Sequence, residues 1–260
     1  MNETDQIVMP SVWSPDAAAL ISFVLRFWFD NRRAPNTADV YHGMGFDHYT
    51  AGRLYRELQL GLAAVVADDR LQLNIIKMLP FSATPTPNKL IIDGQFITYL
   101  GCAGEAFSVS GLPMLEDTQY EVQSSCSCCY APIRLRYFGP ELQTPQEELP
   151  MVAVVGNPHM WEHGVPADRV CDDFHFVLDD AHAERFGRRI SRRHVTMEAL
   201  RMAALSRPIA QRRLRDPASR LWLDAQLHMD AFASLGVDIS LWRPADDPAA
   251  DDSASGRPPG

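Results

Sequence analysis

The chain has 260 residues, of which 46% are hydrophobic and 22% charged, a balance typical of a globular protein rather than a disordered one. Its formal net charge of −9 argues against a general nucleic-acid binder, and no apolar stretch is long enough to span a membrane. The N-terminus lacks the basic and then apolar pattern of a secretory signal. We therefore expect a cytoplasmic protein without a membrane partner, in an oligomeric state that the sequence leaves open.

The first 80 residues predict a helical unit that resembles a winged helix. Ser14-Pro15-Asp16 is typical of a helix start, and apolar spacing continues to Asn31. A short helix over residues 37–43 and a third helix capped by Asp47 follow, before strand candidates begin at residue 72. Because the surroundings are acidic, we interpret this unit as a structural or substrate-covering domain rather than a DNA-binding one.

Strand patterns dominate the middle of the chain. Asp93-Gly94 separates two short apolar runs and predicts a hairpin turn. The segment 82–88 is rich in proline and predicts a loop. The strand candidates cover residues 72–79, 89–92, 96–99, 133–138, 151–155 and 174–178.

The C-terminal part is strongly basic and then acidic. Residues 185–220 contain eleven arginines but only two acidic residues, which gives this segment a charge of +9. The rest of the chain therefore carries a charge of −18. After Gly187 the pattern predicts helices to about Ser234, broken at Pro208 and Pro217, with a solvated basic face; a surface for an acidic partner is the alternative. Residues 244–260 have the composition of a disordered acidic tail.

An odd number of cysteines without a secretory signal favours reduced thiols, available for metal binding or catalysis. The five are Cys102, Cys126, Cys128, Cys129 and Cys171. Cys102 stands where a strand gives way to a helical pattern, and a helix N-terminus favours a thiolate. Glu105 lies three residues on, so both side chains fall on one helix face. A nucleophile or metal ligand paired with a proton donor is one interpretation; a small buried cysteine is the other.

Further metal-ligand residue types cluster at two places. Cys126 and Cys129 form one CxxC knuckle, with Cys128 between them, but the second knuckle of a structural zinc site is missing. Cys171 opens a second cluster that ends at His175, whose alternative role is that of a hydrogen-bonded strand residue. In the loop between, His159 and His163 flank Trp161 without completing a ligand motif.

The order of these pieces resembles the bacterial organomercurial (alkylmercury) lyase family. Tyr99, Cys102 and Glu105 follow the family's order of tyrosine, cysteine at a strand-to-helix junction, and acid. Cys126 precedes Ala131-Pro132 at the offset of the family's structural cysteine, and residues 170–176 resemble its second cysteine strand. The resemblance covers about residues 37–180. It implies a divergent member of α+β fold with a mixed or antiparallel sheet core (81–187). The residue patterns add a winged-helix-like unit (1–80) before this core, and C-terminal helices (188–243) and the tail after it, both of which lie outside the resemblance.

The resemblance also implies a lyase activity on a small-molecule substrate. Cys102 and Cys171 would bind the mercury of R–Hg⁺, or another soft metal, as thiolates, and Glu105 would protonate the departing carbon. No cofactor would be required, and external thiols would remove the product. Cys126 would be structural. Cys126, Cys128 and Cys129 are also candidates for further metal ligands.

Three departures from the family pattern keep two other hypotheses open. Glu105 replaces an aspartate, Gly101 replaces a tryptophan, and Cys128 and Cys129 are additional thiols. A divergent lyase of the same fold could cleave another carbon–metal, carbon–sulfur or carbon–heteroatom bond in specialised metabolism. A non-enzymatic thiolate metal-binding or metal-sensing protein would bind metal without turnover.

Overall fold

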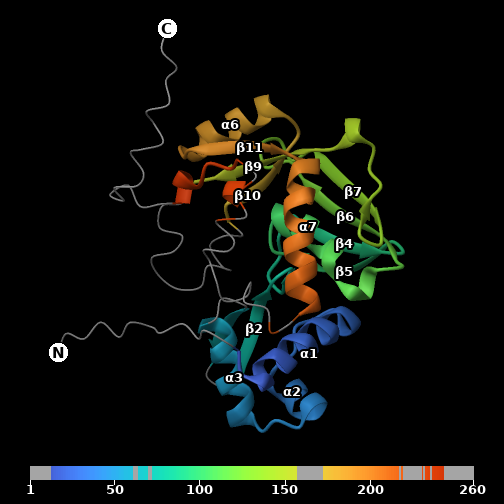
Figure 1. Ribbon diagram of the computed structural model, residues 1–260, viewed down its shortest axis with the longest axis vertical. Coiled ribbons are helices and arrows are strands. Elements are labelled where there is room, and N and C mark those ends of the chain that lie inside the picture. Colours follow the sequence, from blue (N-terminus) through green and yellow to red (C-terminus); the bar gives the residue numbers. More distant parts are fainter. Residues whose placement is uncertain are drawn as a thin grey trace, which may run out of the picture.

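The chain folds as an α+β protein with two antiparallel sheets and surrounding helices (Figure 1). This computed structural model describes residues 13–60, 64–69, 72–156, 172–216, 218, 230, 232–234 and 236–242. Within those ranges, no helix is both long and apolar enough to cross a membrane. The predicted acidic tail, residues 244–260, lies outside the described residues.

Three helices form the N-terminal unit, as the sequence predicts, and the first and third begin at the predicted caps. They are α1 (Pro15–Asn31), α2 (Thr37–Met44) and α3 (His48–Leu60). The Ser14 hydroxyl accepts a hydrogen bond from the Ala17 amide at the start of α1, and the Asp47 carboxylate accepts one from Thr50 at the start of α3. The winged-helix interpretation of this unit stays a prediction.

The larger sheet has eight strands in the order β1-β2-β3-β5-β4-β6-β7-β8, all paired antiparallel. Four of them, β1, β3, β6 and β8, were not predicted. Asp93 and Gly94 form the expected turn between β4 and β5, both with positive φ. The strands are β1 (Ala64–Asp69), β2 (Gln72–Met78), β3 (Phe81–Ser82), β4 (Lys89–Ile92), β5 (Gln95–Leu100), β6 (Gln119–Ser125), β7 (Pro132–Phe138) and β8 (Glu141–Leu142).

The N-terminal helices are joined to this sheet through buried aromatic contacts. The Trp28 indole donates a hydrogen bond of 3.0 Å to the Thr98 hydroxyl on β5, and its ring lies 5.7 Å from that of Phe81 on β3. The sheet itself continues from β2 through β3 to β5, on both sides of residue 80. The division into domains at that residue stays a prediction.

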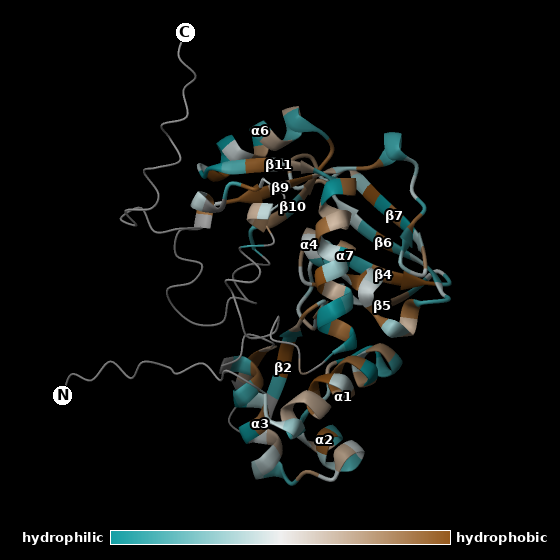
Figure 2. Cartoon of the chain, viewed as in Figure 1, coloured by the Kyte–Doolittle hydropathy of each residue, from teal (hydrophilic) through white to brown (hydrophobic). Residues whose placement is uncertain are grey.

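The smaller sheet has three strands in the order β10-β9-β11, with helix α6 packed beside it. Its bounds are β9 (Met151–Val155), β10 (Phe174–Val177), β11 (His194–Glu198) and α6 (Asp180–Ile190). The central strand β9 is brown along its length in Figure 2, whereas α6 is largely teal or pale. The helix predicted across Val195 is wrong, because β11 pairs with β9 there and the β-branched Val195 and Thr196 suit a strand.

Helix α7 (Ala199–Arg215) runs across the molecule between the two sheets (Figure 1). It continues through Pro208, contrary to the predicted break, since Pro208 lies on the exposed face while Leu205, Ser206 and Ala210 are buried. A Cβ atom at Gly111 would lie 2.8 Å from the Ala210 carbonyl carbon, so the helix backbone packs directly on that glycine. Further helical elements with described bounds are α4 (Ala103–Ser108) and the 3-10 turns η1 (Val109–Gly111), η2 (Pro113–Leu115), η3 (Gln146–Glu148) and η5 (Ile239–Trp242).

Candidate functional site

Cys102 lies at the junction between β5 and α4, as the sequence predicts. It is the N-cap of α4 in an extended conformation, and its carbonyl accepts the first helical hydrogen bond from Ala106 at 3.1 Å. Its side chain makes no capping bond, and the residue is only 4% exposed. The thiol is therefore held at the positive end of a short helix without a capping hydrogen bond to it.

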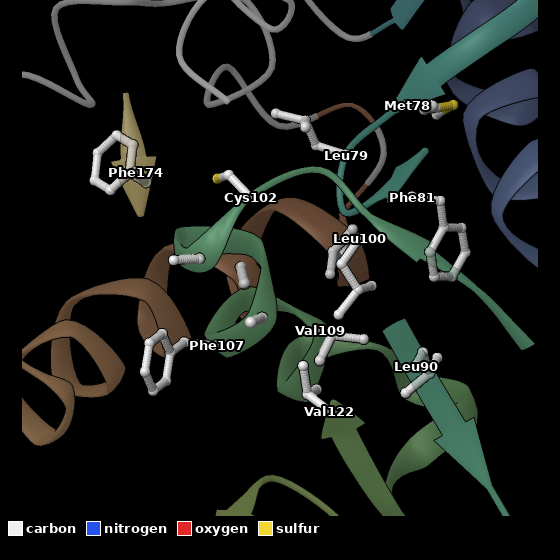
Figure 3. Close-up of a cluster of buried hydrophobic side chains, with 14 of the residues drawn as sticks. Met78, Leu79, Phe81, Leu90, Leu100, Cys102, Phe107, Val109, Val122 and Phe174 are labelled. Atoms are coloured by element: carbon white, nitrogen blue, oxygen red, sulfur yellow. The ribbon is translucent and has the colours of Figure 1, made fainter. Parts of the chain in front are cut away.

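The N-terminus of α4 approaches strand β10 closely. A Cβ atom at Gly104 would lie 3.5 Å from the Cys102 Sγ atom and 3.6 Å from the Phe174 ring. In Figure 3 the Cys102 side chain points towards the strand that carries Phe174. The thiol thus faces the smaller sheet rather than the larger one from which its chain arrives.

A cavity of about 430 Å³ opens beside Cys102. Its wall combines the loop before β4, the β5–α4 junction, the end of β6 and the strand β10. The lining residues are Pro85, Thr86, Pro87, Asn88, Gly101, Cys102, Ser124, Ser125, Ser127, Asp172, Phe174, His175 and Phe176. Segments from the first and second halves of the chain therefore meet at this cavity, beside the Cys102 thiol.

Hydrogen bonds within the protein fix the polar part of this wall. The Ser124 hydroxyl donates to the Asn88 side-chain carbonyl at 2.7 Å, and the Thr86 hydroxyl donates to the Leu100 carbonyl at 2.6 Å. The Ser127 amide donates to the Phe176 carbonyl at 2.8 Å, which ties the segment after β6 to β10. Contacts within the protein thus orient these polar groups.

His175 lines the cavity as a neutral imidazole. Its Nε2 atom lies 2.8 Å from the Asp172 carbonyl oxygen, which can only accept, so Nε2 carries the proton. Nδ1 then accepts from the Ser127 hydroxyl at 3.5 Å. Burial is the main reason that the His175 pKa is lowered from its usual value, because it disfavours the charged ring.

The lowered His175 pKa predicts a loss of stability in mild acid. Unfolded His175 takes up a proton below about pH 6.5 whereas the folded ring resists it, so falling pH favours the unfolded state. We expect the free energy of unfolding of the wild-type protein, relative to His175→Gln, to fall as the pH is lowered from 8 towards 5. Urea unfolding of both proteins across this range measures the difference, and a difference that does not change with pH would contradict the prediction.

Glu105 faces the protein interior and pairs with an arginine. Its carboxylate accepts hydrogen bonds from the Arg213 Nη2 atom, at 3.1 Å to Oε2 and 3.5 Å to Oε1. Glu105 is 7% exposed and Arg213 4%, so the ion pair is buried. Glu105 follows Cys102 on α4, but it is not among the described residues that line the cavity.

The second predicted mercury ligand, Cys171, lies outside the described residues, as do His159, Trp161 and His163. The chain neighbour of Cys171, Asp172, lines the cavity. One residue further, Asp173 is fully buried and accepts a hydrogen bond of 3.0 Å from Arg192. The chain directly after Cys171 is therefore fixed at the cavity wall.

The other cysteines occupy the turn between β6 and β7. Cys126 is fully buried, Cys128 half-buried and Cys129 exposed. Among the described residues, no group of three or more histidine, cysteine, aspartate or glutamate side chains is arranged to hold a metal ion. The structural role of Cys126 and the metal-binding roles of all three stay predictions.

Arg213 is the residue of this site that the sequence-based interpretation missed. The sequence predicts a solvated face for the basic run, but Arg213 belongs to the buried face of α7. Its signal is the helical spacing: Arg213 follows Met202, Ser206 and Ala210 at intervals of three or four residues, and these are buried. An arginine on an apolar stripe indicates a buried carboxylate partner.

Comparison with known proteins identifies the family to which the chain belongs. A family model described as MerB: Alkylmercury lyase matches residues 81–211, while no curated protein sequence matches the chain. Among solved structures, the chain is similar to "Crystal structure of the mercury-bound form of MerB2", with a TM-score of 0.58 and 14% identity over 79% of this chain and 93% of the other. Since the family model spans just over half of the 260 residues, the chain belongs to the alkylmercury lyase family.

Proposed function

We propose that this protein is an organomercurial lyase that cleaves the carbon–mercury bond of R–Hg(II) at the Cys102 cavity. The observation that carries the proposal is the position of Cys102, a buried thiol at a helix N-terminus on the wall of a cavity in an alkylmercury lyase family member. Mercury is a soft metal, and thiolates bind it better than oxygen ligands do.

Two thiolates would hold the substrate mercury. Cys102 supplies the first, and Cys171, the chain neighbour of the cavity residue Asp172, supplies the second. Electron density from two sulfur atoms weakens the Hg–C bond, and the bonding pair passes to carbon as the bond breaks. Hg(II) then remains bound to the two thiolates until external thiols remove it.

Glu105 would carry the proton. Its carboxylate takes the proton that the Cys102 thiol loses on binding mercury, and the resulting carboxylic acid delivers this proton to the departing carbon. The products are R–H and thiolate-bound Hg(II), and Glu105 returns to a carboxylate beside Arg213. The Cys171 thiol loses its own proton to solvent, so R–Hg⁺ and two thiols give R–H, Hg(II) bound by two thiolates and one released proton, without a cofactor.

Protonolysis of phenylmercury tests the proposal directly. We expect the full-length protein, supplied with phenylmercury and excess thiol, to release benzene and Hg(II) in repeated turnovers, measured by headspace gas chromatography. Tight mercury binding without benzene release would favour the metal-binding or metal-sensing hypothesis. Absence of both would leave a lyase that acts on another carbon–heteroatom bond.

A further inference from the structure

The last turn of helix α7 contributes a buried cation to the candidate site. Arg213 is separated from Glu105 by 108 positions in the sequence and lies beyond residues 81–211, which the family model matches. Its Nη2 atom contacts both carboxylate oxygens of Glu105, at 3.1 and 3.5 Å. Both residues are at least nine-tenths buried, so little solvent screens the contact.

The position of this guanidinium is fixed by the packing of its helix. The α7 backbone at Ala210 lies directly against Gly111, where no side chain would fit. Glu105 therefore meets a cation that cannot easily shift along or away from α4.

We propose that Arg213 is a positioning residue for Glu105, and that the buried face of the last turn of α7 is thereby part of the active site. This inference rests on the proposed lyase function. A guanidinium is always charged and only donates hydrogen bonds, so Arg213 gives no proton to the substrate. It restrains the extra torsion that glutamate has over aspartate, and it stabilises the carboxylate that remains when Glu105 has given its proton to carbon.

Steady-state kinetics of phenylmercury protonolysis with two Arg213 variants tests the proposal. We expect Arg213→Met to lower kcat about 10- to 100-fold, the range typical of a misplaced catalytic group, with KM unchanged within about twofold. Arg213→Lys keeps the charge on a more flexible, strongly hydrated group, so its kcat should lie between those of the wild type and the methionine variant. In a Glu105→Gln background, Arg213→Met should cause no further loss.

Arg215→Met is the matched control, because Arg215 lies in the same helix turn but forms an exposed ion pair with Glu116. Its kcat should equal that of the wild type. Thermal unfolding of each variant gives its folded fraction, and the rates are compared per folded molecule. A wild-type kcat in folded Arg213→Met would overturn the positioning role and leave the lyase function intact. If the methionine variant does not fold, a further loss of kcat in Arg213→Met/Glu105→Gln relative to Glu105→Gln would overturn it instead. A wild-type protein that turns over no mercurial would overturn both.

Discussion

Replacement of Cys102 by serine should lower phenylmercury protonolysis by on the order of 10³-fold or more, the scale seen when a covalent or coordinating nucleophile is removed. A serine hydroxyl keeps its proton at neutral pH and is a hard ligand, so it does not compete for mercury with the external thiols. Benzene release measured at saturating phenylmercury gives the rate. Cys171→Ser should cause a loss of similar size.

Serine is a clean substitution at this position for a structural reason. Cys102 is the N-cap of α4 but makes no capping hydrogen bond, whereas serine is among the preferred N-cap residues. The variant should therefore be at least as stable as the wild type, and its lost activity reports on chemistry rather than on folding. Full activity in Cys102→Ser would refute the role of this thiol.

The exposed Cys129 supplies the matched control. Cys129→Ser removes a thiol from the β6–β7 turn, which lies outside the described cavity wall, so it should leave the rate unchanged. Counting bound Hg(II) per protein adds a second measurement. Cys102→Ser should lose the high-affinity mercury site together with turnover, while Cys129→Ser keeps both.

Local signals predicted the parts of the fold that depend on neighbouring residues. Ser14-Pro15 marked the start of α1, Asp93-Gly94 marked the β4–β5 turn, and the run at residues 151–155 marked β9. The strand β11 was missed because its stability comes from pairing with β9, about 40 residues earlier in the chain. Such non-local pairing leaves no periodic pattern in a segment of five residues.

The candidate site also has features that adjacent residues predict and features that depend on distant parts of the chain. The junction that presents Cys102 could be predicted, because a strand, a helix start and a cysteine are adjacent in the sequence. The spacing of Glu105 suggested a shared helix face with Cys102, but the structure turns its carboxylate to Arg213. That partner is set by how α7 packs on α4, and the single sequence offers only the apolar stripe on which Arg213 lies.

Removal of Arg213 should cost more stability than removal of both charges together. Arg213→Met removes the ion-pair partner of the buried Glu105 carboxylate, and breaking a buried pair in this way typically costs about 3–5 kcal/mol. In the double variant Arg213→Met/Glu105→Gln no charge remains to be desolvated, so part of that loss should be recovered. Urea unfolding of the wild type, both single variants and the double variant completes the cycle and gives the coupling energy.

The exposed pair of Arg207 and Glu141 on the same helix is the reference for this cycle. It is 2.7 Å long but largely solvated, and surface pairs of this kind contribute about 0–1 kcal/mol. The coupling energy of Arg213 with Glu105 should exceed that of Arg207 with Glu141, because burial removes the screening by water. Equal coupling energies for the two pairs would contradict the prediction.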